Sequence, residues 1–125
     1  MIIGIGTDVL NVERIQKMID KYGDKFVSRI LSDSEIEIFQ KNSNKICYLA
    51  RRFAGKEAIF KALGTGIGKP FRFSDISIMN DEYGKPEVKI TNRQDAENFY
   101  IESKNINISL SDDMPVVVAF AVISS

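Results

Sequence analysis

The sequence contains no histidine, and Cys47 is its only cysteine. A single cysteine cannot form an internal disulfide, and without a histidine it lacks its usual activating partner for nucleophilic catalysis. Cys47 also lies within a segment of helical spacing, where a thiol packs as a small apolar group. We therefore interpret Cys47 as a buried thiol and set aside cysteine-based chemistry.

An excess of charge of either sign is also missing, because 17 lysines and arginines balance 17 aspartates and glutamates. This balance predicts neither a nucleic-acid partner nor a membrane partner, and any basic surface has to be local. The sequence has no long apolar run, and its opening, MIIGIGTDV, lacks the basic segment of a signal peptide. We therefore expect a cytoplasmic protein.

The chain does contain a regular succession of short elements. At 125 residues it suits one domain that spans residues 1–125. The spacing of apolar residues predicts helices at 12–22, 25–31, 32–42 and 45–63, and strands at 1–9, 75–79, 86–90, 106–110 and 116–123. Ser32 and Glu35 form a capping box at the start of the third helix. Helices in the first half and strands mostly in the second favour an α+β fold.

Glu57 is an unusual residue within the 45–63 helix, because it falls in the middle of the apolar side. Burying an unpaired carboxylate costs several kcal/mol, so the group has to be protonated, ion-paired or bound to a metal. Lys61, four residues later, offers an ion pair as one explanation. From this helix alone, the ion pair and a functional role are equally well supported.

Asp8 shows the same irregularity in the first strand. It lies on the side that carries Gly4 and Gly6, in a strand that is otherwise apolar. Two inward carboxylates from distant segments, with no histidine or cysteine to assist, suit Mg²⁺, which prefers one or two carboxylates together with water and a substrate phosphate. Asp8 and Glu57 are therefore candidate metal ligands.

The glycine-rich segment GTGIGKP follows the 45–63 helix. It is not a P-loop, because it has Pro70 where a P-loop has serine or threonine and it follows a helix instead of a strand. Two alternatives remain: a helix C-cap with a turn, or a loop whose backbone amides approach a phosphate closely, with Lys61 or Lys69 adding charge. Spacing alone favours the cap.

Two stretches, GIGTDVLNVERI at residues 4–15 and RRFAGKEAIFKALGTGIG at residues 51–68, resemble the signature stretches of the holo-[acyl-carrier-protein] synthases. These are the small phosphopantetheinyl transferases of bacterial fatty acid synthesis, and the resemblance covers nearly the whole chain. It implies the 4′-phosphopantetheinyl transferase fold, with helices packed on a small, mostly antiparallel sheet. It also implies a homotrimer with active sites at the subunit interfaces.

The activity implied by the resemblance is Mg²⁺-dependent transfer of 4′-phosphopantetheine from coenzyme A to a serine of apo-acyl carrier protein, which releases adenosine 3′,5′-bisphosphate. The metal ligands would be Asp8 and Glu57, and Lys61 would join them as a catalytic residue. The residues that the resemblance assigns to coenzyme A are Arg52, Lys61, Gly64, Thr65, Gly66, Lys85, Pro86 and Ser111. Arg52 falls on the far side of its helix from Glu57, so it is either a surface arginine or reaches across a subunit boundary.

A basic surface on the first two helices would suit an acidic carrier protein. The resemblance assigns docking to the 12–22 helix, with an apolar residue, Met18, among basic ones. We predict docking through Arg14, Met18, Lys21 and Lys25. Acidic residues interleave with these positions, so an ordinary solvated helix is the alternative. A noncatalytic coenzyme A-binding module would not need both Asp8 and Glu57, and a structural scaffold would need neither. The two acids therefore favour the enzyme.

Two further expectations concern the C-terminal strands. Asp112 stands where familiar members of the family carry a histidine, and we expect it either to pair with a cation such as Lys61 or Arg52 or, preferably, to cap a turn at 111–115. The 116–123 strand is too apolar for an exposed sheet edge and needs covering, either within the monomer or by assembly.

Overall fold

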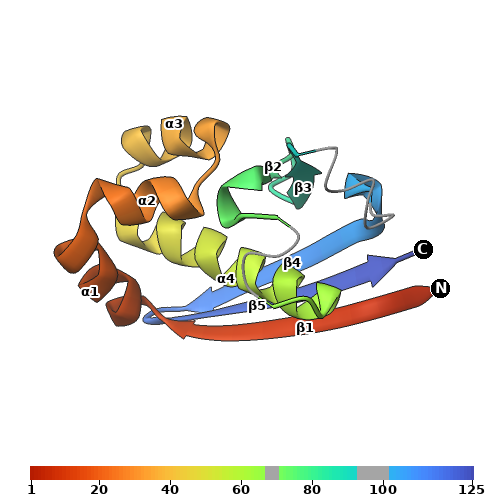
Figure 1. The fold of residues 1–125 in the computed structure, drawn as a ribbon. Coiled ribbons are helices and arrows are strands. Elements are labelled where there is room, and N and C mark those ends of the chain that lie inside the picture. Colours follow the sequence, from red (N-terminus) through yellow and green to blue (C-terminus); the bar gives the residue numbers. More distant parts are fainter. Residues whose placement is uncertain (67–70, 93–101) are drawn as a thin grey trace.

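The computed structural model describes residues 1–66, 71–92 and 102–125. The strands and helices follow in the order shown in Figure 1. They are β1 (Ile2–Asn11), α1 (Val12–Tyr22), α2 (Asp24–Ile30), α3 (Asp33–Lys41), α4 (Lys45–Leu63), η1 (Phe73–Asp75), β2 (Ile76–Asn80), β3 (Pro86–Ile90), η2 (Ser103–Asn105), β4 (Ile106–Asp113) and β5 (Val116–Ser124). The predicted α+β class is confirmed.

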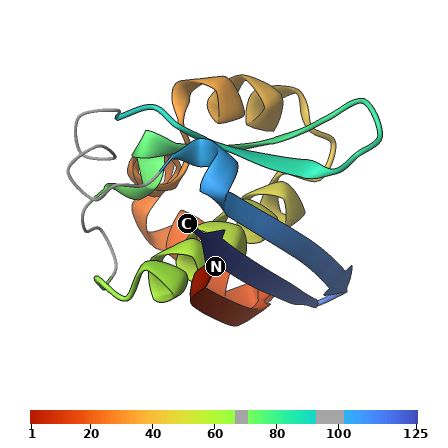
Figure 2. The same ribbon diagram turned by 90° about the vertical axis from the view of Figure 1, so that its right-hand side faces the viewer.

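Two antiparallel sheets lie on either side of α4. One sheet has the order β1-β5-β4, and the other is the β2-β3 hairpin. Figure 1 shows α4 along one face of the larger sheet, with α2, α3 and the β2-β3 hairpin beyond it. The ends of the chain lie side by side (Figure 2), where the Ser125 backbone N–H donates to the Met1 carbonyl at 2.8 Å. Among the described residues, no helix is long and apolar enough to cross a membrane.

The strand at 116–123 is covered within the chain, because β5 pairs with β1 on one side and with β4 on the other. The alternative of an edge covered inside the monomer is therefore correct. The predicted turn at 111–115 is shorter than expected. Ser111, Asp112 and Asp113 continue β4 in register with β5, and the turn itself is confined to Met114 and Pro115.

Close contact between β1 and α4 depends on two glycines. A Cβ at Gly4 would lie 2.0 Å from the Ala62 carbonyl oxygen, and one at Gly6 would lie 2.1 Å from the Ala58 carbonyl oxygen. Such approaches are possible only without a side chain. The strand backbone therefore rests directly on the helix, and Asp8, the next inward residue, is carried toward α4.

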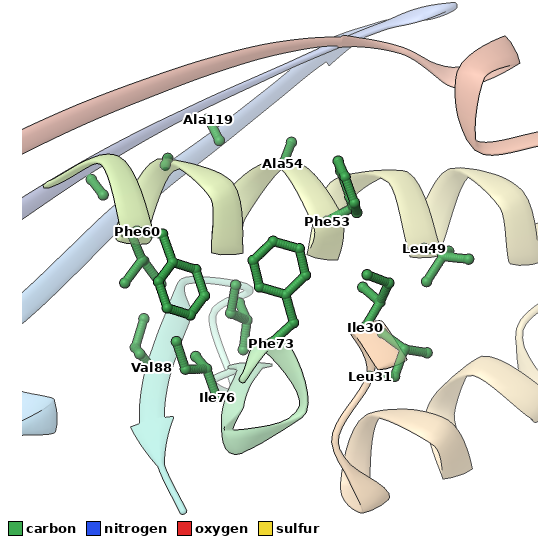
Figure 3. Close-up of a cluster of buried hydrophobic side chains, with 14 of the residues drawn as sticks. Ile30, Leu31, Leu49, Phe53, Ala54, Phe60, Phe73, Ile76, Val88 and Ala119 are labelled. Atoms are coloured by element: carbon green, nitrogen blue, oxygen red, sulfur yellow. The ribbon is translucent and has the colours of Figure 1, made fainter. Parts of the chain in front are cut away.

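The opposite side of α4 packs against large side chains. Phe60 and Phe73 have ring centroids 5.1 Å apart, and Figure 3 shows them with Ile76 and Val88 on the side of the helix away from Ala119 of the sheet. We predicted a single apolar side for this helix, whereas it is buried on nearly all sides along 48–60. The reason is that α4 is the central layer, with a sheet on one face and helices and a hairpin on the other.

Candidate active site

Asp8, Glu57 and Lys61 come together where β1 crosses α4. Asp8 is 6% exposed and Glu57 is 7% exposed, so both carboxyl groups are buried. The Lys61 ammonium donates to the Thr7 carbonyl oxygen at 2.9 Å and to Asp8 Oδ1 at 3.2 Å. The ion pair that Lys61 forms is thus with Asp8, and the Glu57–Lys61 pair considered from the sequence is not the one observed.

Among the described residues, Lys61 forms an ion pair with Asp8, whereas none forms an ion pair with Glu57. Burial, and then the neighbouring Asp8, raise the pKa of Glu57 to about 7, while Arg14 and Lys61 oppose the shift. Within the described part of the chain, Asp8 Oδ2 has no hydrogen-bond partner when both groups are acceptors. Either a shared proton or a bound cation resolves this arrangement. The residues therefore fit a divalent cation.

The side chains available as ligands indicate which cation the site would bind. The described residues contain no group of three or more histidine, cysteine, aspartate or glutamate side chains that could enclose a metal. Two carboxylates leave most coordination positions to water and to an anionic substrate, which is how Mg²⁺ is usually held. Asp8 and Glu57 therefore suit Mg²⁺ better than an ion that is coordinated entirely by protein side chains.

The raised pKa of Glu57 predicts opposite pH dependences for stability and for metal binding. Because its pKa rises from 4.5 to about 7 on folding, the group contributes stability below pH 4.5 that is lost as the pH rises to about 7. A metal ligand has to be deprotonated, so Mg²⁺ affinity should increase with pH up to about 7 and level off above it.

Melting curves of metal-free wild type and Glu57→Gln, taken between pH 4.5 and 8, check the first part of this prediction. The melting temperature of the wild type should fall relative to that of the variant as the pH rises. Calorimetric titration with Mg²⁺ over the same range checks the second part. A constant difference between the two proteins would contradict the assigned titration of Glu57.

The helix end at the glycine-rich segment is a C-cap, as the spacing favoured. The Gly64 N–H donates to the carbonyl oxygens of Phe60 and Lys61 at 3.1 and 3.2 Å. Gly64 and Gly66 have φ angles of 73° and 83°, a left-handed conformation that favours glycine. Thr65 lies between them, and Lys69 lies outside the described residues. The cap does not exclude phosphate binding by the same segment.

Arg52 is buried, so the alternative of a solvent-exposed surface arginine is wrong. It is 3% exposed, its guanidinium lies 4.7 Å from the centroid of the Tyr48 ring, and its Nε lies 3.9 Å from Glu35 Oε2. The structure therefore does not bring Arg52 to the acidic pair. Its predicted contact with coenzyme A stays a prediction.

The other residues assigned to coenzyme A lie on the hairpins. Lys85 is exposed beside Pro86, and both line a groove of about 310 Å³ together with Val88 and Ile106. Ser111 is exposed near the end of β4. These positions are on different elements from Asp8 and Glu57.

The predicted docking residues occupy α1 and the start of α2. Arg14, Lys21 and Lys25 are exposed, and Met18 is partly buried against the core. The Arg14 guanidinium lies 5.6 Å from the centroid of the Phe53 ring, and its charge lowers the pKa of Glu57. The α1 surface therefore borders the acidic pair.

Asp112 forms an ion pair with a residue that we did not consider. Its Oδ2 lies 3.3 Å from Arg51 Nη1, with both side chains about one-third exposed. Neither Lys61 nor Arg52 is its partner, and its position within β4 rules out the turn-cap role. The sequence pattern could not reveal this pairing, because α4 and β4 are far apart along the chain.

A buried ion pair between Glu35 and Lys56 was also missed. Both side chains are completely buried, and the Lys56 ammonium donates to Glu35 Oε1. Burial lowers the pKa of Lys56 to about 8 although the Glu35 carboxylate opposes the shift. The only sequence signal is a lysine directly before Glu57 inside an otherwise apolar segment, whereas Glu35 was explained by its capping box alone.

Comparisons with known proteins agree with this fold. The family model of the 4′-phosphopantetheinyl transferase superfamily matches residues 4–121, so the chain belongs to that superfamily. A holo-[acyl-carrier-protein] synthase of Orientia tsutsugamushi (strain Ikeda) is 46% identical over 129 residues, an alignment that covers 100% of this chain and 98% of that protein. The predicted resemblance to the holo-[acyl-carrier-protein] synthases is confirmed, and the chain is a phosphopantetheinyl transferase.

Solved structures of this group have the same architecture. The crystal structure of holo-[acyl-carrier-protein] synthase from Neisseria meningitidis superposes with a TM-score of 0.91 at 38% identity and covers 100% of both chains. The Helicobacter pylori enzyme in complex with coenzyme A gives 0.83 at 35% identity, covering 96% of this chain and 99% of that one. The arrangement of helices on small antiparallel sheets is therefore that of the group.

Proposed function

We propose that this protein transfers 4′-phosphopantetheine from coenzyme A to a serine of an apo-acyl carrier protein in fatty acid biosynthesis, releasing adenosine 3′,5′-bisphosphate. The observation that carries the proposal is the buried pair Asp8 and Glu57, with Lys61 beside it. The similarity to holo-[acyl-carrier-protein] synthases supports it, since one of these relatives was solved with coenzyme A. The proposed setting is the cytoplasm, with no nucleic-acid or membrane partner.

Asp8 and Glu57 would hold Mg²⁺ through their carboxylate oxygens. When bound, the ion supplies charge neutralisation at the pyrophosphate of coenzyme A and at the leaving phosphate. Lys61 adds a second positive charge from a side chain that is 54% exposed and so able to reach a substrate. The segment Gly64, Thr65 and Gly66 follows Lys61 closely in the chain, and its backbone would orient the phosphates, although the Gly64 N–H is already used in the helix cap.

The reaction is a phosphoryl transfer to an alcohol. The serine oxygen forms a bond to the β-phosphorus of coenzyme A, the bond from that phosphorus to the bisphosphate breaks, and the hydroxyl proton is released. Such a reaction depends on positioning and on charge stabilisation more than on covalent chemistry by the protein. The buried acidic pair and its lysine supply the charged groups that this requires.

Calorimetric titration with coenzyme A, with and without Mg²⁺, distinguishes this function from its rivals. The enzyme should bind coenzyme A more tightly when Mg²⁺ is present. A noncatalytic coenzyme A-binding module would show no dependence on Mg²⁺, and a structural scaffold would bind neither ligand. Mg²⁺-independent binding would therefore contradict the proposed role of Asp8 and Glu57.

The exposed cations of α1 are proposed to dock the acidic carrier protein through Arg14 and Lys21, next to Met18 and Lys25. Reversing Arg14 and Lys21 to glutamate should raise KM for the carrier protein by about tenfold, because charges at an interface rim act mainly on association. KM for coenzyme A should change much less, and added salt should mimic the substitutions. Steady-state kinetics with each substrate varied in turn measures both effects, and equal changes in the two KM values would contradict this surface.

A homotrimer with active sites at the subunit interfaces is proposed from the outer face of the larger sheet. The apolar side chains on that face are unusually exposed, with Ile5 at 62%, Val9 at 68% and Phe120 at 40%. A contiguous apolar face of this kind is typical of an interaction surface. Sedimentation should give a mass three times that of the chain. A stable, fully active monomer at low concentration would contradict both the assembly and the shared site.

A further inference from the structure

The buried pair of Glu35 and Lys56 connects α4 to the layer opposite the sheet. The Lys56 ammonium donates to Glu35 Oε1, to the Ile30 carbonyl oxygen at 2.6 Å and to the Phe73 carbonyl oxygen at 3.0 Å. An ammonium group has three donors, so all of them are used. One side chain of α4 is therefore held by the end of α2, by α3 and by η1.

Both carboxylate oxygens of Glu35 also accept hydrogen bonds. Its Oε1 accepts from the Ser32 backbone N–H at 2.9 Å, and its Oε2 accepts from the Ile78 backbone N–H at 2.8 Å. Arg52 Nε lies 3.9 Å from the same Oε2. The carboxylate consequently ties the start of α3 to β2 while it binds Lys56, and it does not depend on Lys56 alone for a neighbouring positive charge.

Such a pair is a poor source of stability. Replacing a buried ion pair with apolar side chains of similar volume is often neutral or stabilising, because desolvation offsets the attraction. The pair instead constrains the orientation of α4. Three acceptors in fixed positions determine where the Lys56 ammonium lies, and therefore how the helix that carries it is rotated. An apolar side chain would fill the same space without these directed hydrogen bonds.

Lys56 directly precedes Glu57, and the two side chains leave α4 in different directions. Ile30 and Phe73 lie on the side of the helix away from Ala119 of the sheet (Figure 3), whereas Glu57 interacts with Asp8 on β1. We propose that Lys56, held by Glu35, is a positioning residue that fixes the rotation of α4 and so aims the Glu57 carboxylate at Asp8. This inference rests on the proposed function, in which Asp8 and Glu57 hold Mg²⁺.

The test compares Mg²⁺ affinity with stability in the double variant Glu35→Gln/Lys56→Met, which removes both charges and keeps side chains of similar volume. Calorimetry with Mg²⁺ at saturating coenzyme A should show affinity reduced by about tenfold or more, the loss expected when the support of a metal ligand is removed. The urea midpoint of the metal-free protein should fall, because the variant leaves the Ile30 and Phe73 carbonyl oxygens without the donor that Lys56 supplies. The Mg²⁺ affinity is therefore the deciding measurement, since a purely structural pair would lower the midpoint and leave the affinity unchanged.

Ser77→Ala is the matched control, because Ser77 is buried in the same layer and its hydroxyl donates to Ser32 Oγ at 2.6 Å, a hydrogen bond that does not involve Lys56 or Glu57. It should change stability and leave Mg²⁺ affinity unaltered. Glu35→Asp keeps both charges but shortens the carboxylate, so it provides a second variant if the double variant fails to fold, and it should also weaken Mg²⁺ binding.

Wild-type Mg²⁺ affinity in every folded variant of the pair would overturn the positioning role while leaving the proposed function intact. If wild type itself showed no Mg²⁺-dependent binding of coenzyme A, the proposed function would fail, and the positioning role with it. The wild-type titration therefore separates the two failures.

Discussion

Replacing Asp8 with asparagine or Glu57 with glutamine should lower kcat by at least about a hundredfold while the protein remains folded. Each change removes one anionic ligand with little change in volume, and a bound metal contributes several kcal/mol to stabilising the transition state. Both carboxyl groups are buried next to each other, so neutralising either also removes repulsion. Melting temperatures of the metal-free variants should equal or exceed that of wild type, as thermal unfolding can show.

Glu37→Gln is a suitable control, because Glu37 is an exposed glutamate on α3 and its neutralisation should leave turnover unchanged. Transfer at the wild-type rate by either Asp8→Asn or Glu57→Gln would show that the metal assignment is wrong. If Glu57→Gln failed to fold, the carboxylate would be a structural requirement of α4.

Gly6→Ala should destabilise the protein by about 3 kcal/mol, the upper end of the usual cost of overpacking. The new Cβ would lie 2.1 Å from the Ala58 carbonyl oxygen and 2.7 Å from the Ala62 nitrogen, so β1 would have to move away from α4. Because Asp8 is two residues further along the same strand, its distance from Glu57 should increase, and activity should fall with stability. Urea unfolding measures the stability change.

Thr7→Ala in the same strand is the control, since the Thr7 side chain is exposed on the other face and its truncation should cost little. A Gly6→Ala protein as stable and as active as wild type would mean that the close contact between β1 and α4 is not required.

Much of this fold could be predicted from local patterns. The alternation around Asp8, the helical spacing around Glu57 and the glycine that ends α4 each involve residues close together in the sequence. Their periodicity therefore shows directly which side chains share a face. The same reasoning identified two inward carboxylates on separate elements, and the structure brings them together.

Long-range pairings could not be predicted in this way. Arg51 with Asp112 and Glu35 with Lys56 are pairs whose members lie on elements brought together only by packing. Helical spacing places Arg52 on the side of α4 away from Glu57, which favours solvent or a subunit boundary, yet Arg52 is buried because α4 is covered on both faces. The central position of β5 likewise depends on strand order, which apolar composition does not specify.

The most direct test of the proposed function is mass spectrometry of an apo-acyl carrier protein after incubation with this enzyme, coenzyme A and Mg²⁺. We predict a gain equal to one 4′-phosphopantetheinyl group on the carrier protein, abolished by a chelator and absent with Asp8→Asn. A carrier protein of unchanged mass after incubation with folded, coenzyme A-binding wild type would contradict the proposed transferase activity.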